Sequence, residues 1–301
     1  SSASFAKTQN APSACLMTDT QSAASWTRLG LIAGGGGLPR EILNALDPRS
    51  VLVIRLKGFA DDPFDDIEHV EHSVGEIGAI THSLKSAGCD AVCFAGYVTR
   101  PDFKALRLDG AGLKLLPRVL AAGRKGDDAI LRVVVEAFER EGLTVVGADS
   151  LLARNRLEAG RLGRIEPDAN AQADADKAMH VAAEIGRLDI GQGAVVADGL
   201  VLAVEAQEGT NAMLERVAGL PAALRGSPDE RRGVLAKRPK PIQERRIDMP
   251  VVGVDTVRLC DAAGLAGIVL EAGGALVVDR EAVIRELDAR GLFLVVRDAE
   301  A

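Results

Sequence analysis

The sequence predicts an α/β fold with two domains, the first built around an open parallel sheet. Short apolar segments alternate with amphipathic ones, which is the order of strands and helices in such sheets. Hydrophobic residues make up 47% of the chain and aromatic residues only 3%, so Val, Leu, Ile and Ala supply the core, as is typical of buried parallel strands. A chain of 301 residues is long enough for two domains of ordinary size.

The first domain is expected to cover residues 27–156. In the segment 76–87, Ile77, Ile80 and Leu84 recur at the spacing of one helix face, so this segment is expected to pack on a sheet. The other elements follow from the same reasoning. Strands are expected at 28–33, 50–56, 90–95 and 144–146, and helices at 40–45, 76–87, 113–121 and 127–140.

The alternation stops between residues 157 and 172, where Gly, Arg, Asn and Pro are frequent and no apolar face is evident. This stretch is expected to be a linker about which the domains hinge. A smaller α/β or α+β domain, 173–301, is expected to follow. Its expected elements are a helix at 174–186, a strand pair at 193–196 and 199–204, strands at 251–254, 267–270, 275–278 and 292–296, and helices at 256–263 and 280–290.

Charge, cysteine content and hydropathy narrow the possible functions. The net charge of −7 argues against a nucleic-acid-binding protein, which normally presents a basic face. The four cysteines form no C-x-x-C pair, so buried free thiols in a reducing cytoplasm are expected. Residues 1–26 lack the features of a signal peptide and are expected to be a disordered tail or an artificial extension.

A run of glycines follows the first strand: Gly34, Gly35, Gly36 and Gly37. Such a turn before a helix can bring backbone N–H groups to a phosphate, although an isolated one is as often a tight turn without a ligand. The spacing is not G-x-G-x-x-G, and the second strand ends in Leu56-Lys-Gly58 instead of an acid that would hold a ribose. Both facts count against a nicotinamide-dependent oxidoreductase.

Two more segments of the first domain carry polar groups, one after a strand and one at the start of a helix. Tyr97 and Arg100 follow the third strand, where Arg100 either grips a phosphate or is a surface residue before a turn. Asp127 and Asp128 begin a helix, where acids stabilise the positive end of the helix dipole. Capping is the simpler interpretation, and participation in a Mg²⁺ site is the alternative.

The densest polar cluster lies in the second domain. The strand at 199–204 ends in Glu205, and Glu208-Gly-Thr-Asn211 then precedes a helix expected from residue 212. Ligands in α/β proteins tend to bind at the carboxyl ends of strands. Hydrolysis of a diphosphate requires cations that neutralise the phosphate oxygens and a base or metal that activates water. The cluster is therefore a candidate diphosphate site, and an ordinary solvated surface is the alternative interpretation. The neighbouring candidates are Gln192, Lys237, Lys240, Arg246 and Asp248.

Several of these stretches together resemble the UDP-2,3-diacylglucosamine pyrophosphohydrolases of the lipid A pathway, in the type unrelated to calcineurin-like phosphatases. The resemblance spans about residues 29–297, and the order and spacing of its motifs make it specific. The matching stretches are 31–39, 94–101, 126–132, 188–192, 203–213, 237–240 and 243–250.

The resemblance implies a Rossmann-like first domain, a second domain, and a substrate held between them. It implies Mg²⁺-dependent hydrolysis to UMP and 2,3-diacylglucosamine 1-phosphate (lipid X) by a cytoplasmic protein, peripheral at most to the inner membrane and a candidate homodimer. Asp248, Lys237 and the residue at 211 would be catalytic, and Asp248, Glu205 and the residue at 211 would bind the metal. The substrate would contact Gly34, Gly35, Gly36, Gly37, Tyr97, Arg100, Gln192, Glu208, Gly209, Thr210, Lys240 and Arg246.

The chain departs from the family at one position. Asn211 stands where the family has Asp in its Glu-Gly-Thr-Asp-Ala-Met motif. An amide keeps the shape of the carboxylate but carries no charge and does not accept a proton as a base. We therefore expect an inactivated or low-activity variant, engineered or natural; a sugar-nucleotide-binding module without catalysis is the alternative.

Overall fold

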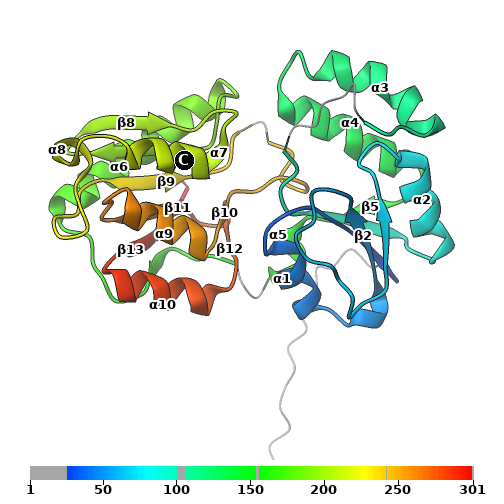
Figure 1. The fold of residues 1–301 in the computed structure, drawn as a ribbon, viewed down its shortest axis with the longest axis horizontal. Helices are drawn as coiled ribbons and strands as arrows, with labels where there is room; N and C mark the ends of the chain where they lie inside the picture. The colour runs from blue at the N-terminus through cyan, green and yellow to red at the C-terminus, as the bar shows by residue number, and fades with distance from the viewer. Residues whose placement is uncertain (1–25, 100–105, 154–155, 242, 300–301) are drawn as a thin grey trace, which may run out of the picture.

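The computed structural model describes residues 26–99, 106–153, 156–241 and 243–299. They form two lobes, each with a central sheet and helices packed on it (Figure 1). The predicted α/β class with a parallel N-terminal sheet is confirmed.

The N-terminal lobe contains a five-stranded sheet in the order β3-β2-β1-β4-β5, with every pair parallel. This is the strand order of a Rossmann-like fold, in which ligands bind beyond the carboxyl ends of the strands. Its elements are β1 (Leu29–Ala33), α1 (Leu38–Ala45), η1 (Pro48–Ser50), β2 (Val51–Leu56), β3 (His69–His72), α2 (Ile77–Ser86), β4 (Ala91–Ala95), α3 (Gly110–Ala122), α4 (Asp127–Arg140), β5 (Thr144–Val145) and α5 (Ala148–Leu151).

Alternation along the central strand directs side chains into two cores. Leu29 and Leu31 of β1 face the core that contains α1, whereas Ile32 faces the core that contains α2 and α4. Gly30 lies on that second face, where an added Cβ would come 2.2 Å from Leu84 of α2. The glycine therefore lets α2 pack directly on the centre of the sheet.

The C-terminal lobe contains a mixed six-stranded sheet in the order β6-β13-β11-β9-β7-β8. Strands β9, β11 and β13 are parallel, while β6, β7 and β8 join by antiparallel pairing. Its elements are β6 (Gly160–Leu162), α6 (Ala169–Arg187), β7 (Gly193–Ala197), β8 (Leu200–Val204), α7 (Gly209–Ala218), α8 (Ala222–Arg225), β9 (Val234–Lys237), β10 (Val251–Val252), α9 (Val254–Ala262), β11 (Gly267–Glu271), β12 (Leu276–Val277), α10 (Arg280–Arg290) and β13 (Phe293–Arg297).

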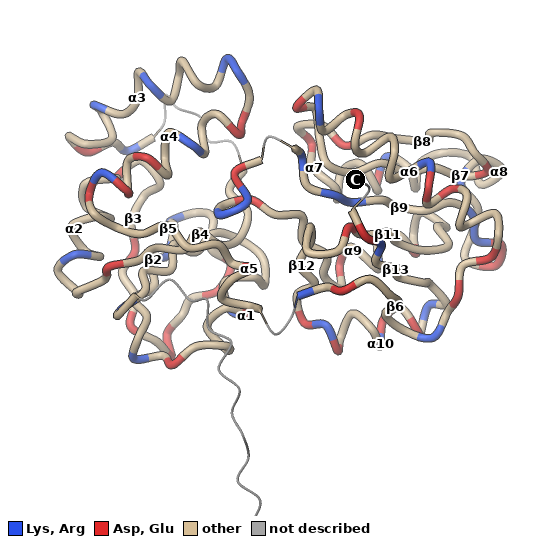
Figure 2. Tube along the Cα trace, turned by 180° about the vertical axis from the view of Figure 1, so that it is seen from behind, with Lys and Arg blue, Asp and Glu red and all other residues tan. Residues whose placement is uncertain are grey.

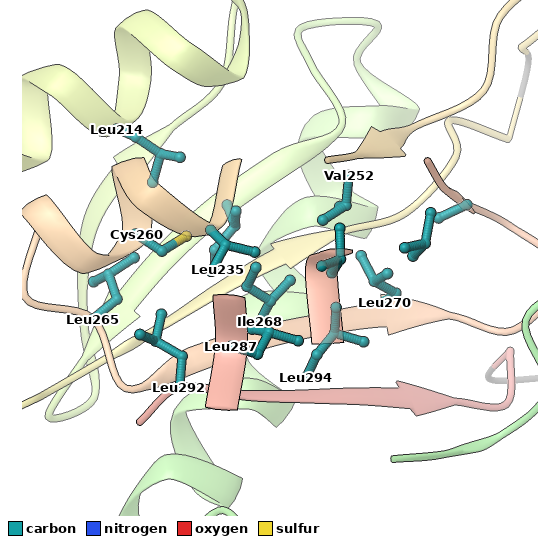
Figure 3. Packing of buried hydrophobic residues seen from close by; sticks show 14 of the residues in the cluster. Leu214, Leu235, Val252, Cys260, Leu265, Ile268, Leu270, Leu287, Leu292 and Leu294 are labelled. Carbon is teal, nitrogen blue, oxygen red and sulfur yellow. The ribbon is translucent and has the colours of Figure 1, made fainter. Parts of the chain in front are cut away.

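Helices cover both faces of this sheet. Leu235 and Ile268 face the layer of α7, α9 and α10, where they pack with Leu214, Cys260 and Leu287 (Figure 3). The neighbouring strand residues Val234, Ala236 and Val269 face the small side chains of α6 on the other side. This alternation of faces explains why the strands read as continuous apolar runs in the sequence.

A two-stranded parallel sheet, β10 with β12, connects the lobes. Val252 and Val277 belong to the C-terminal core, whereas Leu276 belongs to the N-terminal core with Val251 packed against it. Because successive residues of a strand point to opposite faces, this short sheet packs against one lobe on each side.

The structure adds three strands and two short helices, α5 and α8, to the expected elements, and several helices begin earlier than expected. Strand β3 lies between the expected strand 50–56 and the expected helix 76–87, and β9 lies just before the basic stretch that contains Lys240. Strand β6 lies inside the expected linker, where it pairs with β13 and forms one edge of the sheet. Each of these three strands has only three or four residues, too few for an alternation of apolar and polar side chains to be recognised in the sequence. Helix α6 also begins inside the expected linker, at Ala169, because Asp168 caps it by accepting a hydrogen bond from Ala171 N.

The cysteine prediction is confirmed for the part of the chain that the structure describes. Cys89, Cys93 and Cys260 are free and buried. Burial raises the pKa of the Cys93 thiol to about 12, so the thiol stays protonated and packs as a small apolar side chain. Cys15 lies outside the described residues.

Candidate active site

The strand register of the C-terminal sheet brings three predicted site residues together at the same end of neighbouring strands. Gln192 precedes β7, Glu205 follows β8 and Lys237 ends β9. The pairing is fixed by Glu205 N donating to Gly193 O at 2.8 Å and by Arg238 N donating to Gln192 O at 3.0 Å. Glu205 and Lys237 are nearly inaccessible, with 6% and 4% of their surface exposed.

The Glu208-Gly-Thr-Asn211 motif forms the start of α7. The helix begins at Gly209, three residues earlier than expected, so Asn211 is its third residue and is exposed. Thr210 Oγ1 donates to Glu205 Oε1 at 3.0 Å, which ties the helix start to the sheet edge. Glu208 instead pairs with Arg216 of the same helix at 2.6 Å, and its own backbone amide and Arg216 lower the pKa of Glu208.

The buried side-chain amide of Gln243 connects the other polar residues at this end of the sheet. Gln243 is 8% exposed, and its Nε2 donates to Asp248 Oδ2 at 2.6 Å and to Gln192 Oε1 at 3.2 Å. Its Oε1 accepts from Lys240 N at 2.9 Å. The Lys240 ammonium pairs with Asp189 at 2.6 Å, and both side chains are largely buried. Gln192, Lys240 and Asp248 therefore belong to one hydrogen-bonded network.

Within this network, Asp248 is an acid whose pKa is shifted by its surroundings. Burial raises the pKa of Asp248, although the hydrogen bond from Gln243 and the charges of Lys240 and Lys237 oppose the rise. A carboxylate with a raised pKa is a better proton acceptor than an ordinary aspartate. Lys237 lies nearby, where its Nζ donates to Val251 O at 3.1 Å.

The start of α4 meets the C-terminal lobe at this network. Glu244 N donates to Asp128 Oδ1 at 2.6 Å, and Arg246 pairs with Glu139 of α4 at 2.7 Å. Arg246 also pairs with Glu244, and its hydrogen bonds to Glu244 and Glu139 raise the pKa of Arg246. Its guanidinium is thus bound to two carboxylates that link the lobes, and is not free to face a phosphate.

The lobes approach each other closely at Gly126. This residue has φ +126°, and an added Cβ would lie 1.9 Å from Asp189 Oδ2. Only glycine permits this approach, since a side chain would collide with the carboxylate that holds Lys240. The lobe contact therefore depends on one glycine before α4.

We expect the Gly126→Ala substitution to separate the lobes at this contact. The methyl group would push Asp189 away from Lys240, and a misplacement of about 1 Å at a catalytic network costs up to about 10²-fold in rate. Small-angle scattering and substrate turnover measure the two effects. Gly142→Ala is the matched control, because Gly142 also has a positive φ (+84°) but an added Cβ meets nothing within 4 Å. Equal effects of the two substitutions would show that backbone strain alone is responsible.

Three of the four backbone amides in the glycine run of the N-terminal lobe bind protein groups. Gly34 N donates to Ala95 O, Gly35 N to Tyr97 O and Gly36 N to Asp61 Oδ2, at 2.8, 2.9 and 2.7 Å. Gly35 and Tyr97 form an antiparallel bridge, and a Cβ at Gly35 would come 2.5 Å from the Tyr97 ring. Close packing thus accounts for these glycines, and an anion would have to displace Asp61 from Gly36.

Tyr97 itself is 59% exposed, and its hydroxyl donates to Asp61 Oδ2 at 3.3 Å. Partial burial and the Asp61 carboxylate raise the pKa of Tyr97. Its side chain lines the cavity described next. Arg100 lies outside the described residues.

A cavity of about 490 Å³ extends from this site into the N-terminal lobe. Gln207 and Asp248 line its polar end, and Asp127 also contributes. Small-molecule sites typically measure about 300–1,000 Å³, so the space is sufficient for an apolar chain of considerable length. The apolar lining is provided mainly by Ile32, Leu56, Ile80, Phe94, Leu115, Leu116, Val119, Ile130, Leu131, Val134 and Phe138.

The described residues do not bring three His, Cys, Asp or Glu side chains together as a metal-binding group. One buried oxygen is nevertheless available, because Glu205 Oε2 has no hydrogen-bond partner within the described part of the chain. Mg²⁺ is usually held by one or two carboxylates together with substrate phosphates and water. The residues thus fit a Mg²⁺ ion that binds together with a diphosphate, and do not fit a site made by protein ligands alone.

Three residues of the network were not among the predicted site residues: Asp189, Gln243 and Asp128. Asp189 lies three residues after the end of the helix expected at 174–186 and has φ +54°, a conformation that the sequence does not reveal. Gln243 is five residues from Asp248, and the signal available in the sequence was an amide side chain so close to an acid. Asp128 was interpreted mainly as a residue that stabilises the helix start, with participation in a Mg²⁺ site as the alternative.

The fold and the site define a two-domain α/β protein with a buried polar network where the domains meet and an apolar cavity that opens from it. Residues 28–154 match the family described as LpxI N-terminal domain, and residues 158–295 match LpxI C-terminal domain. The UDP-2,3-diacylglucosamine pyrophosphatase LpxI of Caulobacter vibrioides is 55% identical over 275 residues, which cover 91% of this chain and 98% of that protein. The chain belongs to the LpxI family.

Proposed function

We propose that this protein hydrolyses the diphosphate of UDP-2,3-diacylglucosamine to UMP and lipid X. The observation that carries the proposal is the continuity between Asp248 at the polar network and the apolar cavity of the N-terminal lobe. A diacylated sugar nucleotide has the same two parts, a diphosphate and hydrocarbon chains. The 55% identical relative is named for this activity.

The polar network would perform the chemistry. Lys237 and Lys240 would neutralise phosphate oxygens, and Asp248 would accept the proton of the attacking water, since burial raises its pKa. The oxygen of that water joins one phosphorus atom as the bridging P–O bond breaks, and the other phosphate leaves with the bridging oxygen. Gln243 would position Asp248 through its 2.6 Å hydrogen bond.

Magnesium is proposed as the cofactor. Glu205 and Asp248 would hold it, together with an acid at position 211 where the family has one. Bound with the diphosphate, Mg²⁺ would neutralise the charge on its phosphate oxygens. The free Oε2 of Glu205 supports this assignment.

The proposal is tested by measuring UMP release from UDP-2,3-diacylglucosamine by chromatography, with Mg²⁺ and with a chelator. We expect slow release that requires the metal, because Asn211 replaces an acid. Retention of the lipid without release, also after Asn211→Asp, would instead identify a binding module. Tight binding of NAD in a titration would favour an oxidoreductase.

Localisation and assembly complete the proposal. No helix in the described part of the chain has the length and hydropathy of a membrane span. We propose a cytoplasmic protein that contacts the inner membrane peripherally, because its substrate is a lipid. A homodimer is also proposed, since β8 is a sheet edge with Leu200 and Val201 exposed; analytical ultracentrifugation tests it.

A further inference from the structure

Helix α3 is apolar on two neighbouring faces, which lie about 100° apart around the helix axis. Its inner face contributes Gly112, Leu115, Leu116 and Val119 to the lining of the cavity. Its outer face presents Leu113 and Leu120, whose surfaces are 62% and 49% exposed. Figure 1 shows α3 at the outside of the N-terminal lobe, above α4. A helix with leucines exposed to water at this spacing is typical of a surface that binds another apolar phase.

The charge around α3 is opposite to that of the whole protein. Residues 107–125 contain five basic residues and one acid, whereas the chain carries −7; Figure 2 shows basic residues along the helix. Asp109, the acid, is used in capping, where it accepts from Gly112 N at 2.8 Å. Arg107 and Arg118 pair with Glu76 and Glu136.

Three of the five cations have no carboxylate partner within the described residues: Lys114, Arg124 and Lys125. Lys114 lies about 100° from Leu113 around α3, and Arg124 and Lys125 follow directly after the C-terminal end of the helix. Leucines beside unpaired basic residues are the pattern of a helix that lies in the interface of an anionic bilayer.

We propose that α3 docks on the surface of an anionic lipid bilayer through Leu113 and Leu120, with Lys114 and Lys125 contacting the headgroups. This inference extends the proposed function, in which the substrate is a lipid. The bilayer would then contact the same helix that lines the cavity. Within α3 only Gly112 and Ala122 are buried, so few packing interactions oppose a displacement that would admit a hydrocarbon chain.

Flotation of the full-length protein with vesicles tests the proposal. We expect it to float with vesicles of phosphatidylethanolamine and phosphatidylglycerol at low salt and not with phosphatidylcholine alone. Leu113→Ser/Leu120→Ser should lower the bound fraction about tenfold, and Lys114→Gln/Lys125→Gln should lower it and reduce its dependence on salt. Leu188→Ser/Leu224→Ser is the matched control, because these leucines are 71% and 42% exposed in the other lobe.

Flotation that is absent, or equal in the Leu113→Ser/Leu120→Ser variant, would overturn the proposal. Dissociation of a dimer by that variant in analytical ultracentrifugation would also overturn it and identify the face as a contact between copies. Hydrolysis of substrate dispersed in detergent should be unchanged by the variant. Hydrolysis without vesicle binding would contradict this inference alone, whereas vesicle binding without hydrolysis would contradict the proposed function alone.

Discussion

The Asn211→Asp variant is expected to release UMP about 10²–10⁴-fold faster than the present chain, the usual range for one positioned proton acceptor. Residue 211 is exposed in the first turn of α7. A carboxylate there is stabilised by the positive end of the helix dipole and remains hydrated. The substitution should therefore leave the fold intact and add the charge that the family motif contains.

Asn211→Ala is the control, because it removes the amide without adding a carboxylate and should give no gain. Substrate affinity, measured with a chelator present, should be similar in all three forms. Equal turnover of the Asn and Asp forms would show that residue 211 has no chemical role. A gain that persists without Mg²⁺ would assign the carboxylate to proton transfer instead of metal binding.

Asp248→Asn is expected to lower turnover about 10²–10⁴-fold, the usual contribution of a general base, and to stabilise the fold at neutral pH. Burial raises the pKa of Asp248 in the folded state. Its contribution to stability is therefore complete below the pKa of an unfolded aspartate and is lost as the pH rises through the folded pKa. An amide has no charge to bury and still accepts the hydrogen bond from Gln243.

Thermal melting of both forms between pH 4 and pH 8 checks this expectation; these limits bracket the ordinary Asp pKa of about 3.9 and neutrality. The melting temperature of the original chain should fall relative to that of the variant as the pH rises. Asp229→Asn is the control, because Asp229 is exposed, and it should change neither the rate nor the melting curve. A variant that melts lower than the original at pH 8 would indicate that ionised Asp248 stabilises the lobe contact.

Local patterns were sufficient for most of the fold. The helices at 127–140 and 280–290 have the predicted bounds, since their apolar periodicity and first-turn acids are local signals. The strand pair β7 and β8 turns at Asp198 and Gly199, which both have positive φ, as the Asp-Gly pair predicts. Strand β9 was not predicted, because its four residues end in a lysine that only burial at the sheet edge explains.

The site was predicted less completely than the fold. Gln192 and Glu205 were identified because they flank predicted apolar strands, and Lys237 because it belongs to a cluster of cations between strands. For the glycine run the sequence left a phosphate loop and a tight turn open, and in the structure the amides of three of these glycines bind Ala95, Tyr97 and Asp61. A glycine that allows close backbone packing and a glycine that admits a ligand have the same sequence signal.

The sequence by itself determined the α/β class and the polar strand ends, because periodicity, turns and strand-terminal residues depend on neighbours along the chain. Only the tertiary structure decided which polar groups meet. Glu244 reaches Asp128 across 116 residues, and Lys240 reaches Asp189 across 51. Both contacts depend on how the segment before β10 folds between the two lobes. Packing at that distance is governed by the shape of both lobes, which no local pattern contains.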